Sequence, residues 1–147
     1  MGTTFSISVD ISAPVEKVWR HLVDWKSQGQ WMAMTRVDSS DSGADDSGIG
    51  TTIDAFTGIG KFGILDRMKV TQWNPPTFCA VEHYGNVIKG IGEFRLEPMR
   101  FSGMERTRFH WFEEIPGPRL LLAIIKPGIL TAVFFSLRKF ARLVERA

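Results

Sequence analysis

The sequence has few of the residues that build covalent or metal-bound sites. Its 147 residues include one cysteine, Cys79, and three histidines, His21, His83 and His110. A single cysteine excludes an internal disulfide and a multi-cysteine zinc site, and the histidines lack the spacing of zinc ligands. No serine lies in a nucleophile-elbow motif. We therefore expect no metal and no other cofactor.

Targeting signals and long uninterrupted apolar runs are also missing. Residues 1–6 contain neither the basic nor the apolar region of a signal peptide, so we expect a cytoplasmic protein. The apolar stretch 120–137 is interrupted at Lys126, Pro127 and Gly128, which leaves pieces far below the ~20 residues that cross a bilayer. We expect no stable membrane insertion, although a helix with a basic end is able to touch a membrane surface.

The composition is otherwise that of an ordinary globular chain. Hydrophobic residues make up 44% and charged residues 23%, and we expect one domain over residues 1–147. Eleven Phe and five Trp accompany a single Tyr. Rings in this number indicate a large apolar core or a cavity lined by aromatic side chains.

Charge is spread unevenly along the chain. The net charge is +2, yet residues 119–147 carry six Lys or Arg and one Glu, so the preceding residues are acidic overall. We expect the basic excess to lie on the solvent side of a terminal helix. Aromatic residues rarely alternate with these bases, and we therefore expect no nucleic-acid partner.

Apolar periodicity predicts an α+β chain. Alternating apolar residues predict a strand over 5–11, and a helix start at Pro14 introduces two short helices over 14–22 and 25–31. Six further strands are predicted over residues 33–38, 50–58, 61–73, 77–84, 87–96 and 104–115. Their short connections are typical of an antiparallel meander. A helix over 129–145 is predicted to follow an apolar lead-in that breaks at Pro127 and Gly128.

Two tempting motifs have simpler explanations. Residues 58–63 match the G-x-G-x-x-G pattern of dinucleotide sites, but a strand follows where that motif needs a helix. The Asp-rich loop over 39–48 lacks the spaced glycine and glutamate of a calcium loop. We expect a glycine hairpin and a solvated loop, respectively.

Four segments have sequence patterns similar to those of a known family: residues 9–19, 70–76, 90–96 and 105–111. With the order of elements, they resemble the START/Bet v 1-like (SRPBCC) superfamily, in its polyketide cyclase/dehydrase-like branch. The resemblance implies a helix-grip fold, in which a curved antiparallel sheet of about six to seven strands wraps around a long C-terminal helix. It also implies an apolar cavity for a lipid, polyketide or aromatic ligand. Separately, we expect a monomer or homodimer.

Strand alternation predicts which side chains face this cavity. In the strand over 61–73 we place Phe62, Ile64, Asp66, Met68 and Val70 inward. In the last strand we place Thr107, Phe109, Trp111 and Glu113 inward and His110 outward, and in the strand over 77–84 we favour Cys79, Val81 and His83. The predicted ligand-binding residues are Trp31, Phe62, Ile64, Met68, Val81, Phe109, Trp111, Val133 and Leu137.

Asp66, His83 and Glu113 are the candidate catalytic residues. A histidine beside buried carboxylates is suited to general acid–base chemistry on a ligand carbonyl, although a core polar network would use the same residue types. Three hypotheses follow. The protein binds a hydrophobic small molecule, or acts on it as a cyclase/dehydratase-type enzyme, or uses its basic terminal helix as a protein-interaction module.

Overall fold

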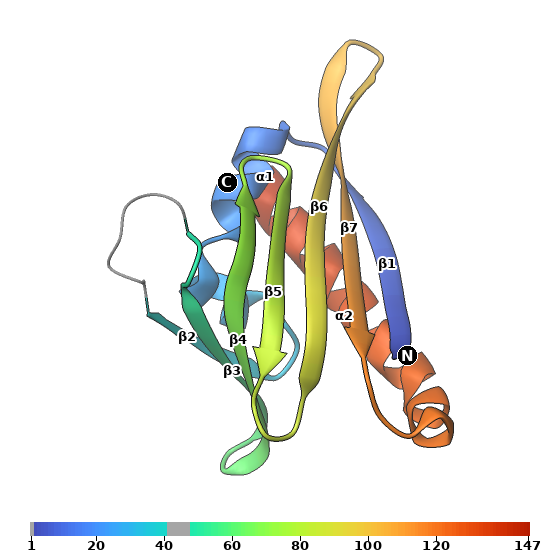
Figure 1. Cartoon of the computed structure of the whole chain (residues 1–147). Helices are drawn as coiled ribbons and strands as arrows, with labels where there is room; N and C mark the ends of the chain where they lie inside the picture. The colour runs from blue at the N-terminus through green and yellow to red at the C-terminus, as the bar shows by residue number, and fades with distance from the viewer. Residues whose placement is uncertain (1, 41–47) are drawn as a thin grey trace.

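A curled seven-stranded sheet and one long helix form the framework of the molecule (Figure 1). The computed structural model describes residues 2–40 and 48–147. The elements in chain order are β1 (Thr3–Ile11), α1 (Val15–Leu22), the 3-10 helix η1 (Trp25–Gln30), β2 (Thr35–Ser40), β3 (Thr52–Ile59), β4 (Phe62–Asn74), β5 (Phe78–Tyr84), β6 (Lys89–Phe101), β7 (Met104–Ile115) and α2 (Arg119–Arg146). This arrangement confirms the predicted helix-grip fold.

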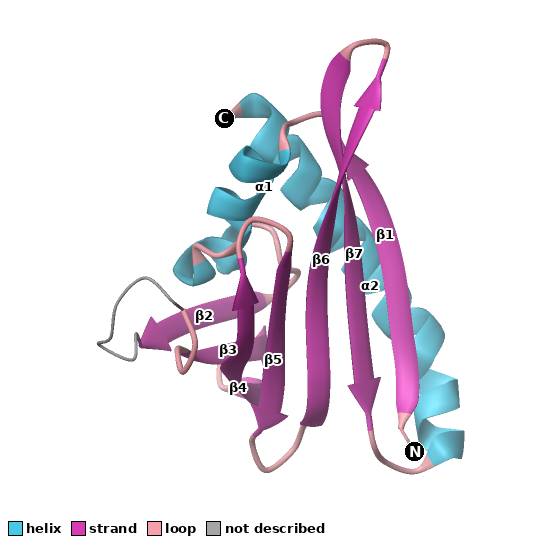
Figure 2. Cartoon of the chain, turned by 45° about the horizontal axis from the view of Figure 1, so that its top comes forward, coloured by secondary structure: helices cyan, strands magenta, loops and turns pink. Residues whose placement is uncertain are grey.

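The sheet is antiparallel throughout, with the order β1-β7-β6-β5-β4-β3-β2. Strands β2 to β7 are successive neighbours, and β1 joins the far edge by pairing with β7. Helices α1, η1 and α2 lie on the same side of this sheet (Figure 2). The side chains of that face therefore form the interior of the molecule.

The glycine motif at 58–63 is a hairpin, as expected. Ile59 pairs with Phe62 across a two-residue turn, Gly60-Lys61, and Gly60 has a φ of +61° that favours glycine. Strand β4 follows directly, so no helix N-terminus is present here for a pyrophosphate. The solvated loop predicted over 39–48 begins two residues too early, because Ser39 and Ser40 belong to strand β2. Residues 41–47 of that loop lie outside the described residues.

Strand β6 is longer than the sequence suggests. It runs to Phe101 through Pro98, where a turn was expected. The pairing of β6 with β5 ends at Arg95, which pairs with Phe78. From there to Phe101, β6 pairs only with β7. Pro98 therefore needs no N–H on the β5 side, and the strand continues to the tip of the hairpin.

Helix α2 is also longer than expected. It begins at Arg119 and continues through Pro127, so the predicted break at residues 127–128 was wrong. Proline removes one backbone hydrogen bond inside a helix. Ala123, four residues earlier, is exposed, so that water is able to reach its carbonyl group, and the Thr131 hydroxyl donates to the Pro127 carbonyl over 2.8 Å.

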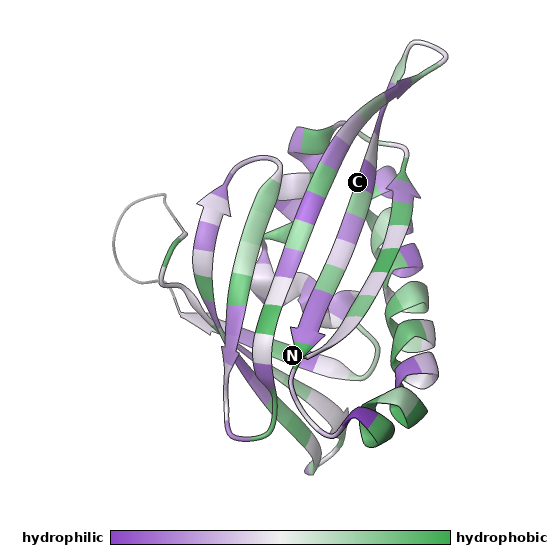
Figure 3. Ribbon diagram, turned by 45° about the vertical axis from the view of Figure 1, so that its right-hand side comes forward, coloured by the Kyte–Doolittle hydropathy of each residue, from purple (hydrophilic) through white to green (hydrophobic). Residues whose placement is uncertain are grey.

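The two halves of α2 differ in their surroundings. Length and composition alone would allow this helix to cross a membrane. Its carboxyl half packs in the core through Val133, Leu137, Phe140 and Val144, as the periodicity predicted. The turns of its amino-terminal half expose apolar side chains instead. Hydrophobic residues of the helix are coloured green in Figure 3.

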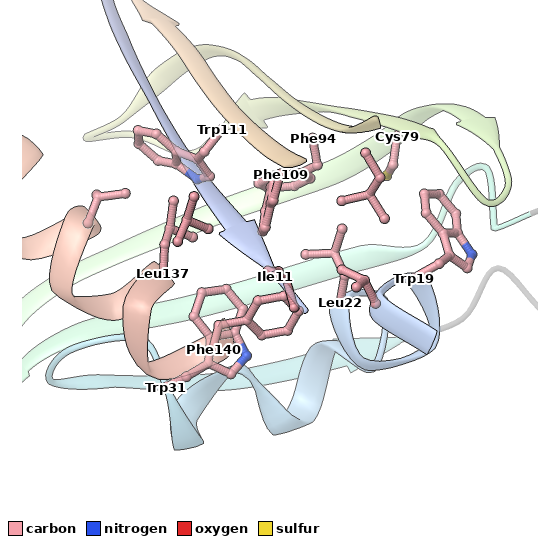
Figure 4. Close-up of a cluster of buried hydrophobic side chains, with 14 of the residues drawn as sticks. Ile11, Trp19, Leu22, Trp31, Cys79, Phe94, Phe109, Trp111, Leu137 and Phe140 are labelled. Carbon is pink, nitrogen blue, oxygen red and sulfur yellow. The ribbon is translucent and has the colours of Figure 1, made fainter. Parts of the chain in front are cut away.

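The packed part of the core lies between α1, the carboxyl half of α2 and the sheet (Figure 4). Phe140 is its centre, because the centroid of its ring lies 4.7 Å from the ring centroid of Trp31 and 5.7 Å from that of Phe109. Ile11 and Leu22 complete the packing and are fully buried. Large rings at this end leave little space between helix and sheet.

We predict that Phe140→Ala lowers the free energy of unfolding by about 3–5 kcal/mol, because a buried phenyl group is replaced by a cavity. Phe135→Ala, on the same helix but 64% exposed, is the matched control and should change stability little. Urea unfolding of both variants measures the difference. Similar losses for the two would contradict the assignment of the core.

Candidate functional site

A cavity of about 330 Å³ lies between the sheet and the middle of α2. Small side chains border it, including Ala55 of β3 and Ala132 and Ser136 of α2, whereas rings fill the space nearer the carboxyl end of the helix. Most of the lining is apolar, with Trp25, Trp31 and Trp111 as its largest members. An apolar cavity with a few polar groups is typical of a site for a small molecule.

Asp66 and His83 form a hydrogen-bonded pair at this cavity. Met68 of β4 pairs with His83 of β5, so Asp66, two residues before Met68, is a diagonal neighbour of His83 on the same face. His83 Nδ1 lies 2.8 Å from Asp66 Oδ1 and 3.0 Å from Oδ2. Because a carboxylate only accepts, Nδ1–H is the donor.

Glu113 approaches the other nitrogen of the same ring. His83 Nε2 lies 3.5 Å from Glu113 Oε1, an ion-pair distance beyond that of a good hydrogen bond. Nε2 is buried without a hydrogen-bond partner among the described residues. The His83 side chain is fully buried, and that of Glu113 is 14% exposed and lines the cavity.

A glycine allows this approach across the sheet. Glu113 is on β7 and His83 on β5, with β6 between them. The β6 residue that pairs with Glu113 is Gly92. A Cβ at Gly92 would lie 3.3 Å from His83 Nε2 and 3.1 Å from Val81 Cγ2, closer than nearly all such contacts. A side chain at this position would therefore crowd the ring.

The imidazole carries a positive charge at neutral pH. Burial lowers the pKa of His83, but the hydrogen bond to Asp66 and the nearby charge of Glu113 outweigh that effect, and the pKa rises from 6.5 to about 10. Burial raises the pKa of Glu113, and the charged ring of His83 opposes that shift only in part. Asp66 and Glu113 line the cavity and thus flank a buried cation, and burial makes Glu113 easier to protonate than an ordinary glutamate.

Further polar side chains reach the cavity from other elements. The Ser136 hydroxyl donates to the Ala132 carbonyl and accepts from the Ala33 amide, over 2.8 and 3.0 Å. The amide of Gln28 lines the cavity and makes no side-chain hydrogen bond to a described residue. The indole N–H of Trp31, another lining residue, is also buried without a hydrogen-bond partner among the described residues. Gln28 and Trp31 are therefore polar groups that are free to pair with a ligand.

The lone thiol is not part of this chemistry. Cys79 is fully buried, and burial raises its pKa to about 12. A thiol in this state carries almost no thiolate at neutral pH and is a poor nucleophile. Among the described residues, no group of three His, Cys, Asp or Glu could hold a metal ion.

The structure brings together the three candidate catalytic residues, Asp66, His83 and Glu113, although their role in a reaction stays a prediction. His110 faces outward, where it contacts Ser8 and Glu97. The predicted ligand-binding residues that border the cavity are Trp31, Ile64, Met68, Trp111 and Val133.

Four predicted ligand-binding residues lie away from the cavity. Phe62 is 87% exposed, because the β3–β4 hairpin carries it past the end of the cavity. Val81, Phe109 and Leu137 do face inward, but they are buried among core side chains and are not part of the lining. Alternation identified the inner face of each strand and could not show how far along it the cavity extends.

Sequence reasoning did not identify Gln28, Ser136 or Gly92 as site residues. Gln28 lies among polar and small residues and Ser136 among large apolar ones, and neither carries a motif. Gly92 did have a usable signal, since a glycine inside a strand often marks a close approach of another group. Knowing what approaches it requires the register of three strands.

We predict a pH-dependent contribution of the site to stability. Because the pKa of His83 is raised in the folded state, its contribution is fully present below pH 6.5 and is lost as the pH rises through about 10. The pKa of Glu113 is also raised, so its contribution to stability is present below pH 4.5 and is lost as the pH rises above that value.

The triple variant Asp66→Asn, His83→Gln, Glu113→Gln carries none of these charges and should lack this decline. We expect the difference between the two proteins to change by a few kcal/mol over the range, in order of magnitude. Urea unfolding at a series of pH values measures it. Parallel stability curves would show that the ring is not charged in the folded protein.

Comparisons with known proteins place the chain in one family. Residues 2–145 match the family described as polyketide cyclase / dehydrase and lipid transport. No protein with a curated function matches the sequence significantly.

Solved structures share the fold at low sequence identity. The Zhui aromatase/cyclase from Streptomyces sp. R1128 has a TM-score of 0.76 at 14% identity, covering 99% of this chain and 95% of that one. A Chromobacterium violaceum protein has a TM-score of 0.69 at 19% identity, covering 97% of both chains. Norcoclaurine synthase from Thalictrum flavum has a TM-score of 0.66 at 14% identity, covering 98% and 94%. These likenesses concern the fold, and the match over nearly the whole sequence gives the assignment: the chain belongs to the polyketide cyclase/dehydrase and lipid transport family.

Proposed function

We propose that the protein binds a hydrophobic small molecule, of lipid, polyketide or aromatic type, in the cavity between the sheet and α2. The observation that carries this proposal is an apolar cavity of about 330 Å³ whose wall includes Asp66 and Glu113, the two carboxyl groups that flank the buried ring of His83. Burial of apolar ligand surface would supply affinity at about 25 cal/mol per Å². The description of the family includes ligands of this kind.

The polar groups would fix the orientation of the ligand. A hydroxyl or carbonyl group of the ligand would pair with Glu113 at one wall, and a second polar group would pair with the amide of Gln28. Trp111 and Met68 would contact its apolar body. A ligand that is apolar with one or two oxygen atoms therefore fits this cavity better than a fully apolar or a charged one.

Native mass spectrometry of freshly purified protein tests for a retained ligand. We predict a bound mass that disappears on denaturation, and at least about a tenfold loss of affinity for an apolar fluorescent probe in Val133→Trp, which places a large ring at a buried position of the cavity lining. Ala123→Trp, at an exposed position of the same helix outside the lining, is the control. Absence of bound mass, together with equal probe affinity in both variants, would rule out binding in this cavity.

A second candidate function is catalysis in the same cavity. It is favoured by the raised pKa of Glu113 beside the cationic ring of His83. In cyclisation of a polyketide, a base removes a proton from a carbon next to one carbonyl, and that carbon attacks a second carbonyl, whose oxygen takes up a proton. Loss of water completes a dehydration. Glu113, which lines the cavity, would move the proton. The positive charge of His83, buried beside Glu113, would stabilise the negative oxygen through space, and Asp66 would hold the ring of His83 in place.

We predict that Glu113→Gln lowers turnover of a linear poly-β-ketone thioester by about a hundredfold or more while binding changes only a few fold, since general acid–base groups contribute about that much. His110→Gln is the matched control, because that histidine lies on the same strand and faces outward. Cyclised product is measured by chromatography. Turnover unchanged by Glu113→Gln would contradict catalysis by Glu113 and leave ligand binding as the proposed function.

The interaction-module hypothesis rests on the exposed bases of α2, chiefly Arg138, Lys139 and Arg142. No contact among the described residues favours it over a solvated helix face. It stays a prediction.

A further inference from the structure

One end of the molecule is formed by three segments that are far apart in the sequence. They are the β3–β4 hairpin (57–64), the β5–β6 turn with its flanks (84–91), and the β7–α2 connection with the first turns of α2 (115–128). We call them together the apolar end. Figures 1 and 3 place all three at the same end, opposite the β6–β7 hairpin.

The apolar end exposes large hydrophobic side chains from each of its segments. Phe62 is 87% and Leu120 77% exposed. The other exposed hydrophobic residues here are Ile59, Ile64, Tyr84, Val87, Ile91, Leu121, Ile124 and Ile125. Single exposed apolar residues are ordinary on a protein surface, but a concentration at one end marks an interaction site.

The segments of the apolar end carry charge of one sign, and the exposed Glu82 and Glu114 pair with Ile91 at its border. Its thirty residues contain Lys61, Lys89, Arg119 and Lys126 and not one of the sixteen Asp and Glu of the chain. Lys61, Lys89 and Arg119 are exposed. Bases next to protruding apolar side chains complement a surface that has anionic groups outside and hydrocarbon beneath.

We propose that the apolar end docks on the surface of an anionic membrane. The side chains of Phe62, Leu120 and Ile124 enter the boundary between lipid headgroups and acyl chains, and the four bases contact lipid phosphates. The contact is peripheral, because the carboxyl half of α2 is part of the protein core. A second copy of the chain fits this end less well, since a twofold contact would press four positive charges against the same four.

This orientation also turns the cavity toward the lipid. Ile64, Ile88 and Ile115 belong to the apolar end and border the cavity as well. An apolar ligand would thus pass between bilayer and cavity along apolar side chains. Docking itself does not depend on the proposed ligand-binding function, and vesicle binding of ligand-free protein tests it separately.

Cosedimentation with vesicles tests the proposal. The protein is mixed with vesicles of phosphatidylcholine alone or with added phosphatidylserine, at low and high salt. We expect binding to the anionic vesicles, weakened by salt, and about a fivefold loss of partitioning for each change in the pair Lys61→Gln and Lys89→Gln.

The apolar contribution is tested without changing charge. Phe62→Ser with Leu120→Ser should lower partitioning to anionic vesicles by about tenfold or more per side chain. The matched control is Phe101→Ser with Met104→Ser, two apolar residues that are 67% and 68% exposed at the tip of the opposite β6–β7 hairpin. The control should bind as the unchanged protein does, and circular dichroism confirms that both variants are folded.

Several outcomes would overturn the proposal. They are no binding to either vesicle type, equal binding to both types at low salt, and equal losses in the two serine variants. A dimer that Phe62→Ser with Leu120→Ser converts to a monomer, without vesicle binding by either form, would assign the apolar end to self-association instead.

Discussion

The site depends on one electrostatic constraint: an imidazole buried in the protein must be balanced by opposite charge. The His83 side chain is fully buried, and its cationic form persists because Nδ1–H donates a hydrogen bond to Asp66 and Glu113 lies 3.5 Å from Nε2. The two carboxylates come from different strands on either side of β5. The β4–β5 register brings Asp66 to the ring, and the absent side chain of Gly92 opens the path from Glu113. A one-residue slip of either pairing would turn these groups to the outer face.

The group formed by Asp66, His83 and Glu113 lies beside a cavity because side chains do not fill the whole interior. Toward its carboxyl end, α2 presents Phe140, which packs between Trp31 and Phe109. One or two turns earlier it presents Ala132 and Ser136, and the cavity occupies the space that larger side chains would fill. Farther still toward its start, the helix leaves the core and shows apolar side chains to solvent. The helix thus changes from packing element to cavity wall to exposed surface along its length, in line with a protein that handles apolar molecules near a lipid surface.

Much of this could be predicted from the sequence, and the failures have physical reasons. Alternation placed Asp66, His83 and Glu113 on inner faces, because in a sheet with one buried face the period of two decides orientation. The same rule placed Phe62 inward, although the hairpin extends beyond the cavity there. Pro127 predicted a helix break, yet one missing hydrogen bond on an exposed face did not end α2. The role of Gly92 depends on contacts across three strands, which no local pattern contains. The separation of cavity from packed core depends on side-chain volumes summed over many elements.

The charge state of the buried ring is the most direct test of this account. Nitrogen NMR of protein labelled in histidine, with His83 assigned through the His83→Gln variant, reports whether each ring nitrogen carries a proton. At neutral pH the account predicts that both nitrogens of His83 are protonated, with Nδ1–H hydrogen-bonded to Asp66. A neutral ring with one unprotonated nitrogen would contradict it, because the two carboxylates would then not be holding a cation at the cavity wall.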